Sequence, residues 1–205
     1  MKKFLFKQKF CESLPKSFSK TLLALSLGLI LLGIFAPFPK VPKQPSVPLV
    51  FHLTEHYARF IPTILSVAIP LIQRDAIGLF QVANASIATT LLTHTTKRAL
   101  NHVTINEQRL GERPYGGNFN MPSGHSSMVG LAVAFLMRRY SFKKYFWLLP
   151  LVPLTMLARI YLDMHTIGAV LTGLGVGMLC VSYKPQKALI KSLNSCFYNL
   201  HKKSF

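Results

Sequence analysis

Charged side chains are scarce in this sequence: Lys, Arg, Asp and Glu make up 15% of its 205 residues. Acidic side chains are the rarest, with six Asp and Glu against 24 Lys and Arg, which gives a formal net charge of +18. Half of the residues are hydrophobic, and they form long blocks instead of one-faced or alternating patterns. A soluble domain rarely carries so little charge, and long apolar blocks are typical of membrane spans. The composition therefore favours an integral membrane protein.

Cysteine is also scarce, and potential metal ligands do not cluster in the sequence. The three cysteines, Cys11, Cys180 and Cys196, have the spacing of neither a disulfide framework nor a metal site. No carboxylate cluster has metal-ligand spacing, so we expect no metal and no cofactor. The basic residues lie between apolar blocks, where they act as topology signals and as contacts to anionic headgroups. No nucleic-acid partner is expected, because no basic stripe lies on a soluble fold.

Six apolar blocks predict an all-α, polytopic membrane bundle of six transmembrane helices. The blocks cover residues 21–38, 51–72, 76–100, 123–137, 145–162 and 165–183. Their lengths suit a helix that rises about 1.5 Å per residue through a hydrocarbon core of about 30 Å. A basic arm (1–20) precedes the predicted transmembrane domain (21–183), and a basic tail (184–205) follows it. Because no small-x-small cleavage site precedes Pro37, the first block is predicted to be an uncleaved span.

The distribution of basic residues predicts the orientation. Six spans put both termini on one side, and that side holds most of the Lys and Arg residues. By the positive-inside rule, the termini are cytoplasmic. The half-polar stretch 51–59 is expected to lie along the membrane interface. The non-cytoplasmic face still keeps several basic residues, which indicates an anionic ligand there. These residues are Lys97, Arg98, Arg109, Arg113 and Arg159.

Three short elements on that face carry candidate chemistry. They are Arg113 before a proline in the polar loop 101–122, the sequence PSGH at 122–125, and Arg159 followed six residues later by His165. Ser123 and Gly124 suit a helix start, where an anion approaches free backbone N–H groups. Arginine forks, a backbone cradle and two imidazoles, His125 and His165, together suit a phosphate group.

Each of these groups also has an ordinary structural interpretation. A histidine at a membrane interface is usually solvated, a Ser-Gly pair usually caps a helix, and Arg159 alone could extend toward headgroups. These interpretations lose force because all the groups fall on one predicted face of a chain that is poor in polar residues.

The three elements, in this order and spacing, resemble the signature of the type 2 phosphatidic acid phosphatase (PAP2) superfamily. The resemblance covers about residues 90–180, and the predicted six-span layout agrees with it. Within the superfamily, the small size and single core resemble the bacterial lipid A phosphatases, the 1-phosphatase type more than the 4′-phosphatase type.

The resemblance implies a mechanism. His165 attacks phosphorus and forms a phosphohistidine, which water later hydrolyses. His125 protonates the leaving oxygen and then activates the water. Arg113, Arg159, a further cation and the amides near Ser123 and Gly124 hold the phosphate oxygens.

The first signature element departs from the superfamily pattern. The lysine that usually lies seven residues before the Arg-Pro pair is Asn106 here. Lys97, further upstream, is predicted to supply the missing cation, with Arg98 and Arg109 as rivals. The serine that usually precedes the third-element arginine is Ala158.

The third signature element departs at a more important position. The Asp that usually follows the nucleophile by four residues is Ala169. That Asp would orient the other ring nitrogen, so another group must do so here. Asp163 and Glu112 are the nearby candidates.

The resemblance therefore implies an enzyme that removes a phosphate from an anionic lipid, with lipid A at position 1 as the first choice. Undecaprenyl diphosphate phosphatase and lipid A 4′-phosphatase are alternatives of the same class. A membrane protein that binds lipid phosphate without catalysis is the alternative of another class, since Ala169 removes a support of the nucleophile.

Overall fold

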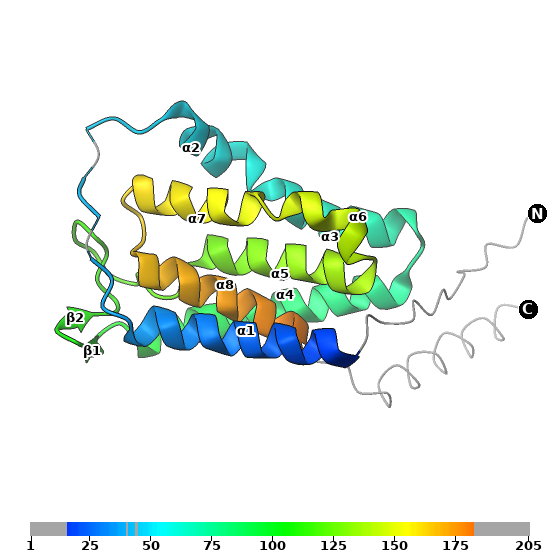
Figure 1. Cartoon of the computed structure of the whole chain (residues 1–205), viewed down its shortest axis with the longest axis horizontal. Helices are drawn as coiled ribbons and strands as arrows, with labels where there is room; N and C mark the ends of the chain where they lie inside the picture. The colour runs from blue at the N-terminus through cyan, green and yellow to red at the C-terminus, as the bar shows by residue number, and fades with distance from the viewer. Residues whose placement is uncertain (1–15, 40, 44, 183–205) are drawn as a thin grey trace, which may run out of the picture.

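The computed structural model describes residues 16–39, 41–43 and 45–182, which fold mostly into helices (Figure 1). The helical class is as predicted. The predicted basic tail and most of the predicted basic arm lie outside the described residues. The elements, in chain order, are α1 (Lys16–Phe35), α2 (Leu49–Leu53), the π-helix η1 (Thr54–Ala58), α3 (Phe60–Ile72), α4 (Ala76–Ala99), β1 (Thr104–Ile105), β2 (Gln108–Arg109), α5 (Gly124–Arg139), α6 (Phe142–Tyr145), the 3₁₀ helix η2 (Phe146–Leu148), α7 (Leu151–Tyr161) and α8 (Ile167–Ser182).

Prolines set several helix boundaries and shorten the predicted blocks. Helix α1 ends at Phe35, two residues before Pro37, because the residue before a proline disfavours helical geometry. Helices α2 and α7 begin directly after Pro48 and Pro150. The predicted span 51–72 is therefore three consecutive pieces, α2, η1 and α3, and the predicted span 145–162 is divided where α7 begins.

The predicted polar loop 101–122 contains a small antiparallel hairpin, β1–β2. Its turn residues, Asn106 and Glu107, have φ values of 50° and 62°, as a two-residue hairpin turn requires. The Asn106 side chain donates to the Phe35 carbonyl oxygen at 2.9 Å, and Gln108 Nε2 donates to the Phe38 carbonyl oxygen at 3.0 Å. The hairpin is thereby attached to the end of α1.

Helix α5 lies at the centre of the bundle, between α7 and α8 in the view of Figure 1. Every residue from Val129 to Met137 is buried. Glycines on α8 allow the two helices to approach closely: a Cβ on Gly173 or Gly177 would collide with the carbonyl oxygens of Ser123 and Ser127. This contact fixes the first turn of α5 against α8.

The outer faces of the bundle are apolar. Large hydrophobic residues on α1, α3 and α4 are exposed, including Leu31 (56%), Ile64 (62%) and Leu91 (62%). Among the described helices, Ala76–Ala99 is long and apolar enough by itself to cross a membrane, and Lys20–Phe35 and Ile167–Ser182 are shorter apolar helices. Exposed apolar surface of this extent marks a contact with lipid or with another protein.

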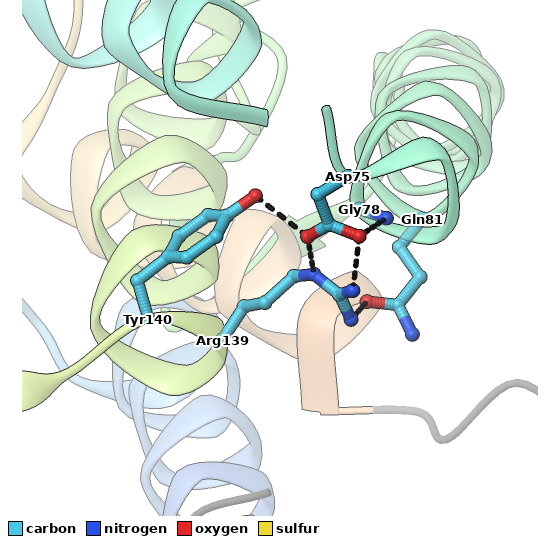
Figure 2. A network of polar contacts seen from close by, with 5 residues as sticks. All are labelled: Asp75, Gly78, Gln81, Arg139 and Tyr140. Carbon is cyan, nitrogen blue, oxygen red and sulfur yellow. Dashed lines mark hydrogen bonds and ion pairs between the residues drawn. The ribbon is translucent and has the colours of Figure 1, made fainter. Parts of the chain in front are cut away.

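A polar network ties α4 to the end of α5 (Figure 2). Arg139 Nε donates to Asp75 Oδ2 at 2.6 Å, and Arg139 Nη2 forms an ion pair with Asp75 Oδ1. Tyr140 and the Gly78 backbone N–H each donate to the same carboxylate at 2.9 Å. Arg139 Nη1 donates to Gln81 Oε1 at 2.7 Å. We call these five residues the Asp75 network.

Candidate active site

The predicted site residues lie at the end of the bundle opposite the Asp75 network. Lys97 is in the last turn of α4, His125 is in the first turn of α5, and Arg159 is in the last turn of α7. Arg113 lies in the loop that follows the hairpin, and His165 lies between α7 and α8. In Figure 1 these segments meet at the end that carries the hairpin.

A tight turn at the end of α7 positions His165. Asp163 adopts the left-handed conformation, with φ of 57°. Its N–H donates to the Ile160 carbonyl oxygen at 3.0 Å, and the Met164 N–H donates to the Arg159 carbonyl oxygen at 3.0 Å, which is the Schellman helix ending. The His165 N–H donates to the same Arg159 oxygen at 3.2 Å. The backbone of the predicted nucleophile is therefore fixed to the last turn that carries Arg159.

The imidazole of His165 is buried and uncharged. The residue is 2% exposed. Burial, followed by the charges of Arg159, Lys97 and Arg113, lowers the pKa of His165 to about 2, although a hydrogen bond with the backbone of Asn120 opposes the shift. The ring is therefore neutral at physiological pH, which is the form that can act as a nucleophile.

Three cations gather around that ring. Lys97 lies within electrostatic range of Arg113 and Arg159, and all three act on His165. Of the two rival cations, Arg98 is exposed, whereas Arg109 donates to the Asn101 carbonyl oxygen at 3.0 Å and to Asn118 Oδ1 at 2.8 Å. The structure thus brings Lys97, and neither rival, together with the two arginines.

The first turn of α5 lies at this site, and one backbone N–H at its start already has a hydrogen-bond partner. The Ser123 N–H donates to the Ala169 carbonyl oxygen at 2.9 Å, because α8 packs directly against this turn. Ser123 is the N-cap residue, and its hydroxyl forms no capping bond. The amides of Gly124 and His125 have no carbonyl partner within the helix by their position. The Ser123 hydroxyl is buried and accepts from Ser126 Oγ at 3.2 Å, so of the two predicted residues Gly124 is the one whose N–H has no partner within the helix.

Glu55 is a site residue that the sequence did not suggest. Its Oε1 accepts from Arg159 Nη1 at 2.6 Å, and it lies 3.7 Å from Arg59 Nη1 and 4.0 Å from His125 Nε2. The carboxylate comes from η1, and π-helical turns frequently occur at functional sites. Glu55 and Arg59 belong to the stretch 51–59 that is predicted to lie along the membrane interface, and their side chains face inward, with exposed fractions of 15% and 19%. The one available signal was a carboxylate inside an apolar block.

Several buried polar atoms in this cluster have no hydrogen-bond partner within the described ranges. They are Glu55 Oε2, Arg59 Nε, Arg113 Nε and Arg159 Nε. Three of the four are guanidinium donors, and buried donors ordinarily have acceptors. An anion with several oxygens would supply them. No three His, Cys, Asp or Glu side chains of the described residues come together as a candidate metal site.

The model of the PAP2 superfamily matches residues 76–187 of this chain. The chain belongs to the PAP2 superfamily. A Helicobacter pylori protein named "Lipid A 1-phosphatase" is 98% identical over 182 residues, which are 89% of this chain and 96% of the relative. A protein of the same name from a second Helicobacter pylori strain is 91% identical over 181 residues, 88% of this chain and 95% of that one. A crystal structure of a transmembrane PAP2 type phosphatidylglycerolphosphate phosphatase from Bacillus subtilis has 18% sequence identity and a TM-score of 0.46, over 88% of this chain and 87% of that one.

The first departure from the PAP2 signature has a structural explanation. Asn106, at the position of the usual lysine, forms the tip of the hairpin and bonds to the end of α1. The hairpin thus lies between α4 and the Arg113 loop, and Lys97 at the end of that helix is within electrostatic range of Arg113.

The second departure concerns the group beside His165. Neither predicted candidate takes that place: Asp163 forms the left-handed turn position, and Glu112 is exposed. Asn120 faces the ring instead, with its Oδ1 3.3 Å from His165 Nδ1. Asn120 lies two residues before the PSGH sequence, where nothing in the linear sequence distinguishes it from other loop asparagines.

Proposed function

We propose that this protein is a lipid A 1-phosphatase, which hydrolyses the phosphate ester at position 1 of lipid A through a phosphohistidine. The names of the two Helicobacter pylori relatives support the substrate. The observation that carries the chemistry is the buried, uncharged His165 within range of Lys97, Arg113 and Arg159. A neutral nucleophile among fixed cations is what attack on an anionic phosphate requires.

In the first step, His165 attacks phosphorus while the cations hold the phosphate oxygens. Charge on those oxygens redistributes in the transition state, so preorganised donors lower the barrier. The bond from phosphorus to the lipid oxygen breaks, and the leaving oxygen takes a proton from His125. In the second step, His125 accepts a proton from water, water attacks the phosphohistidine, and phosphate and free His165 are released.

Glu55 supports the acid role of His125. Its carboxylate lies 4.0 Å from His125 Nε2, and a bound phosphate would add a second negative charge near the same ring. Nearby negative charge favours the imidazolium, which is the form that donates a proton. The His125 side chain is 33% exposed, so it can exchange protons with water between turnovers.

The proposal places the site at the periplasmic surface of the inner membrane, with six spans and both termini in the cytoplasm. In this arrangement the basic arm (1–20) and the basic tail (184–205) are cytoplasmic. The apolar outer faces of α1, α3 and α4 and the distribution of basic residues support it. Reporter fusions test the topology: a carboxyl-terminal green fluorescent protein is expected to fluoresce, and an alkaline phosphatase fusion after Arg113 is expected to be active. The reverse pattern would refute the orientation.

The function is tested by incubating purified protein with lipid A that carries phosphates at both positions 1 and 4′. Mass spectrometry is expected to show loss of the 1-phosphate only. His165→Ala is expected to abolish the reaction, and His94→Ala, which alters an exposed histidine on α4, is expected to retain it. Undecaprenyl diphosphate and phosphatidylglycerophosphate are tested in parallel. Faster turnover of either lipid would reassign the substrate, and binding of lipid A without turnover would leave only a binding protein.

A further inference from the structure

The side chain of Asn120 is buried and its amide orientation is fixed. The residue is 1% exposed. Its Nδ2 donates to the Leu110 carbonyl oxygen at 3.3 Å and to Thr166 Oγ1 at 2.9 Å. Its Oδ1 accepts from the Thr166 backbone N–H at 3.1 Å. Two acceptors on one side and a backbone donor on the other determine which end of the amide is oxygen.

This orientation determines which nitrogen of His165 carries the proton. Asn120 Oδ1 lies 3.3 Å from His165 Nδ1. An amide oxygen can only accept a hydrogen bond, so the ring nitrogen that faces it must be the donor. The neutral ring then holds its proton on Nδ1 and its free lone pair on Nε2.

We propose that Asn120 is the positioning residue of the nucleophile: it holds His165 in the Nδ1–H tautomer and directs Nε2 toward phosphorus. This inference rests on the proposed function, because it names the atom that performs the attack. The Nε2 lone pair forms the new bond to phosphorus, and the electron pair of the broken bond leaves with the lipid oxygen, which is protonated by His125. The ring keeps its Nδ1 proton and carries a positive charge until water displaces it.

A neutral partner suits the charges of this site. A carboxylate beside Nδ1 would add a negative charge close to Lys97, Arg113 and Arg159, where it would compete with phosphate for these cations. An amide oxygen orients the ring without adding charge. Ala169, at the position of the usual acid, is 0% exposed and packs in one cluster with Leu110 and Met121 of the loop that carries Asn120.

The network also joins the ring to helix α8. Thr166 Oγ1 accepts from the Ala169 N–H at 3.3 Å, which caps the helix, and it accepts from Asn120 Nδ2 as well. The direction of Nε2 is thus coupled to the first turn of α8.

The tautomer is tested directly by nitrogen NMR of the full-length protein in detergent micelles, with ¹⁵N-labelled histidine. The signal that disappears in His165→Gln belongs to His165. At neutral pH, it is expected to show a protonated Nδ1 and an unprotonated Nε2. A proton on Nε2 in the wild-type protein would overturn the inference. This measurement needs neither turnover nor a stable Asn120 variant, so its result is independent of whether the proposed lipid is the substrate.

Enzyme kinetics test how much the contact between Asn120 and His165 contributes to catalysis. Asn120→Ala is expected to lower kcat on lipid A about 10–100-fold with little change in KM, as loss of an orienting partner does. In the same variant, the His165 signal is expected to shift toward an average of the two tautomers. An unchanged kcat with an unchanged tautomer would refute the role of Asn120.

Two matched variants separate orientation from loop structure. Asp163→Gly suits the left-handed turn position, and Asn118→Ala alters an exposed amide of the same loop as Asn120. Both are expected to keep the wild-type kcat and tautomer. A loss in Asp163→Gly as large as that in Asn120→Ala would assign the orienting role to Asp163 instead.

Discussion

The two ends of helix α5 carry polar clusters of opposite character. At the Arg139 end, one carboxylate meets one guanidinium, and Tyr140, Gly78 and Gln81 complete the hydrogen bonds of both (Figure 2). At the His125 end, Glu55 faces a majority of cations, and three guanidinium donors have no partner among the described residues. Sixteen residues of helix, about 24 Å at about 1.5 Å per residue, connect the two clusters.

The difference distinguishes a polar cluster whose hydrogen bonds are formed within the chain from one that, on the proposed function, binds an anionic ligand. Burial disfavours the charged form of Asp75, but hydrogen bonds from Arg139, Gly78 and Tyr140 and the charge of Arg139 outweigh it and lower the pKa of that carboxyl. The Asp75 network is thus complete within the chain. The site cluster keeps positive charge and buried donors in excess, which costs stability unless an anion binds. Breaking each cluster should therefore affect different properties of the protein.

Arg113→Gln should produce the largest effect. Its buried Nε has no hydrogen-bond partner among the described residues, so on the proposed function its removal takes a contact from the phosphate without breaking a bond of Nε within the chain. We expect kcat/KM on lipid A to fall about 10²–10³-fold, as for loss of one preorganised donor, with the thermal midpoint unchanged or raised. The exposed Arg98→Gln is the control and should change neither quantity. A lowered midpoint in Arg113→Gln would contradict the distinction between the two ends.

Arg139→Gln should produce the converse result. It leaves the Asp75 carboxylate without its main partner in a half-buried place. We expect the free energy of unfolding in SDS titrations to fall by about 2–3 kcal/mol, less than the about 3–5 kcal/mol of a fully buried pair. The kcat of the folded fraction should not change. Lys143→Gln, which alters an exposed cation just beyond α5, should leave both values at the wild-type level.

Glu55→Gln tests the role of the Glu55 carboxylate in the site cluster. The amide keeps a similar shape but removes the negative charge beside His125 and Arg159. Because His125 must be protonated to act as an acid, the alkaline limb of the rate–pH profile should move to lower pH. At neutral pH we expect a fall in kcat of about 10-fold. Glu112→Gln alters an exposed carboxylate next to Arg113 and should reproduce the wild-type rate–pH profile. An unmoved limb in Glu55→Gln would leave Glu55 as a partner of Arg159 alone.

Much of the fold was accessible from the sequence because its signals are local. The apolar blocks located the helical segments, and Pro37, Pro48 and Pro150 marked where helices end or begin. The membership in the PAP2 superfamily was predicted from short motifs and is confirmed by the family model. The six-span topology and the roles of the site residues stay predictions.

The residues that the sequence did not reveal are those whose role depends on distant contacts. Glu55 and Arg159 are 104 positions apart, and Asn120 and His165 are 45 positions apart. An isolated Glu or Asn has no spacing that identifies its partner. The acidic residue expected beside His165 was sought among nearby carboxylates, whereas the fold supplies an amide from the loop before α5. Only packing of that loop against α8 brings the two together.

Tyr140→Phe should have the smallest effect, and its pH dependence identifies the bond that is lost. The change removes the 2.9 Å hydrogen bond to Asp75 Oδ2 and retains the ring, which packs edge-on against Phe135 and Tyr145. At neutral pH we expect a loss of about 1 kcal/mol in the free energy of unfolding.

The sign of the pH dependence follows from Asp75. Its native pKa lies below the ordinary value of 3.8, so the stability that it contributes is complete above that value and is lost as the pH falls through the lowered native pKa. The difference in free energy of unfolding between the wild-type protein and Tyr140→Phe, measured in SDS titrations, should therefore shrink below pH 3.8, as the carboxyl of Asp75 is protonated. Tyr161→Phe, at the site end of α7, is the control and should show no such dependence. If the loss in free energy of unfolding of Tyr140→Phe stays constant on acidification, it comes from packing of the ring and not from the Asp75 network.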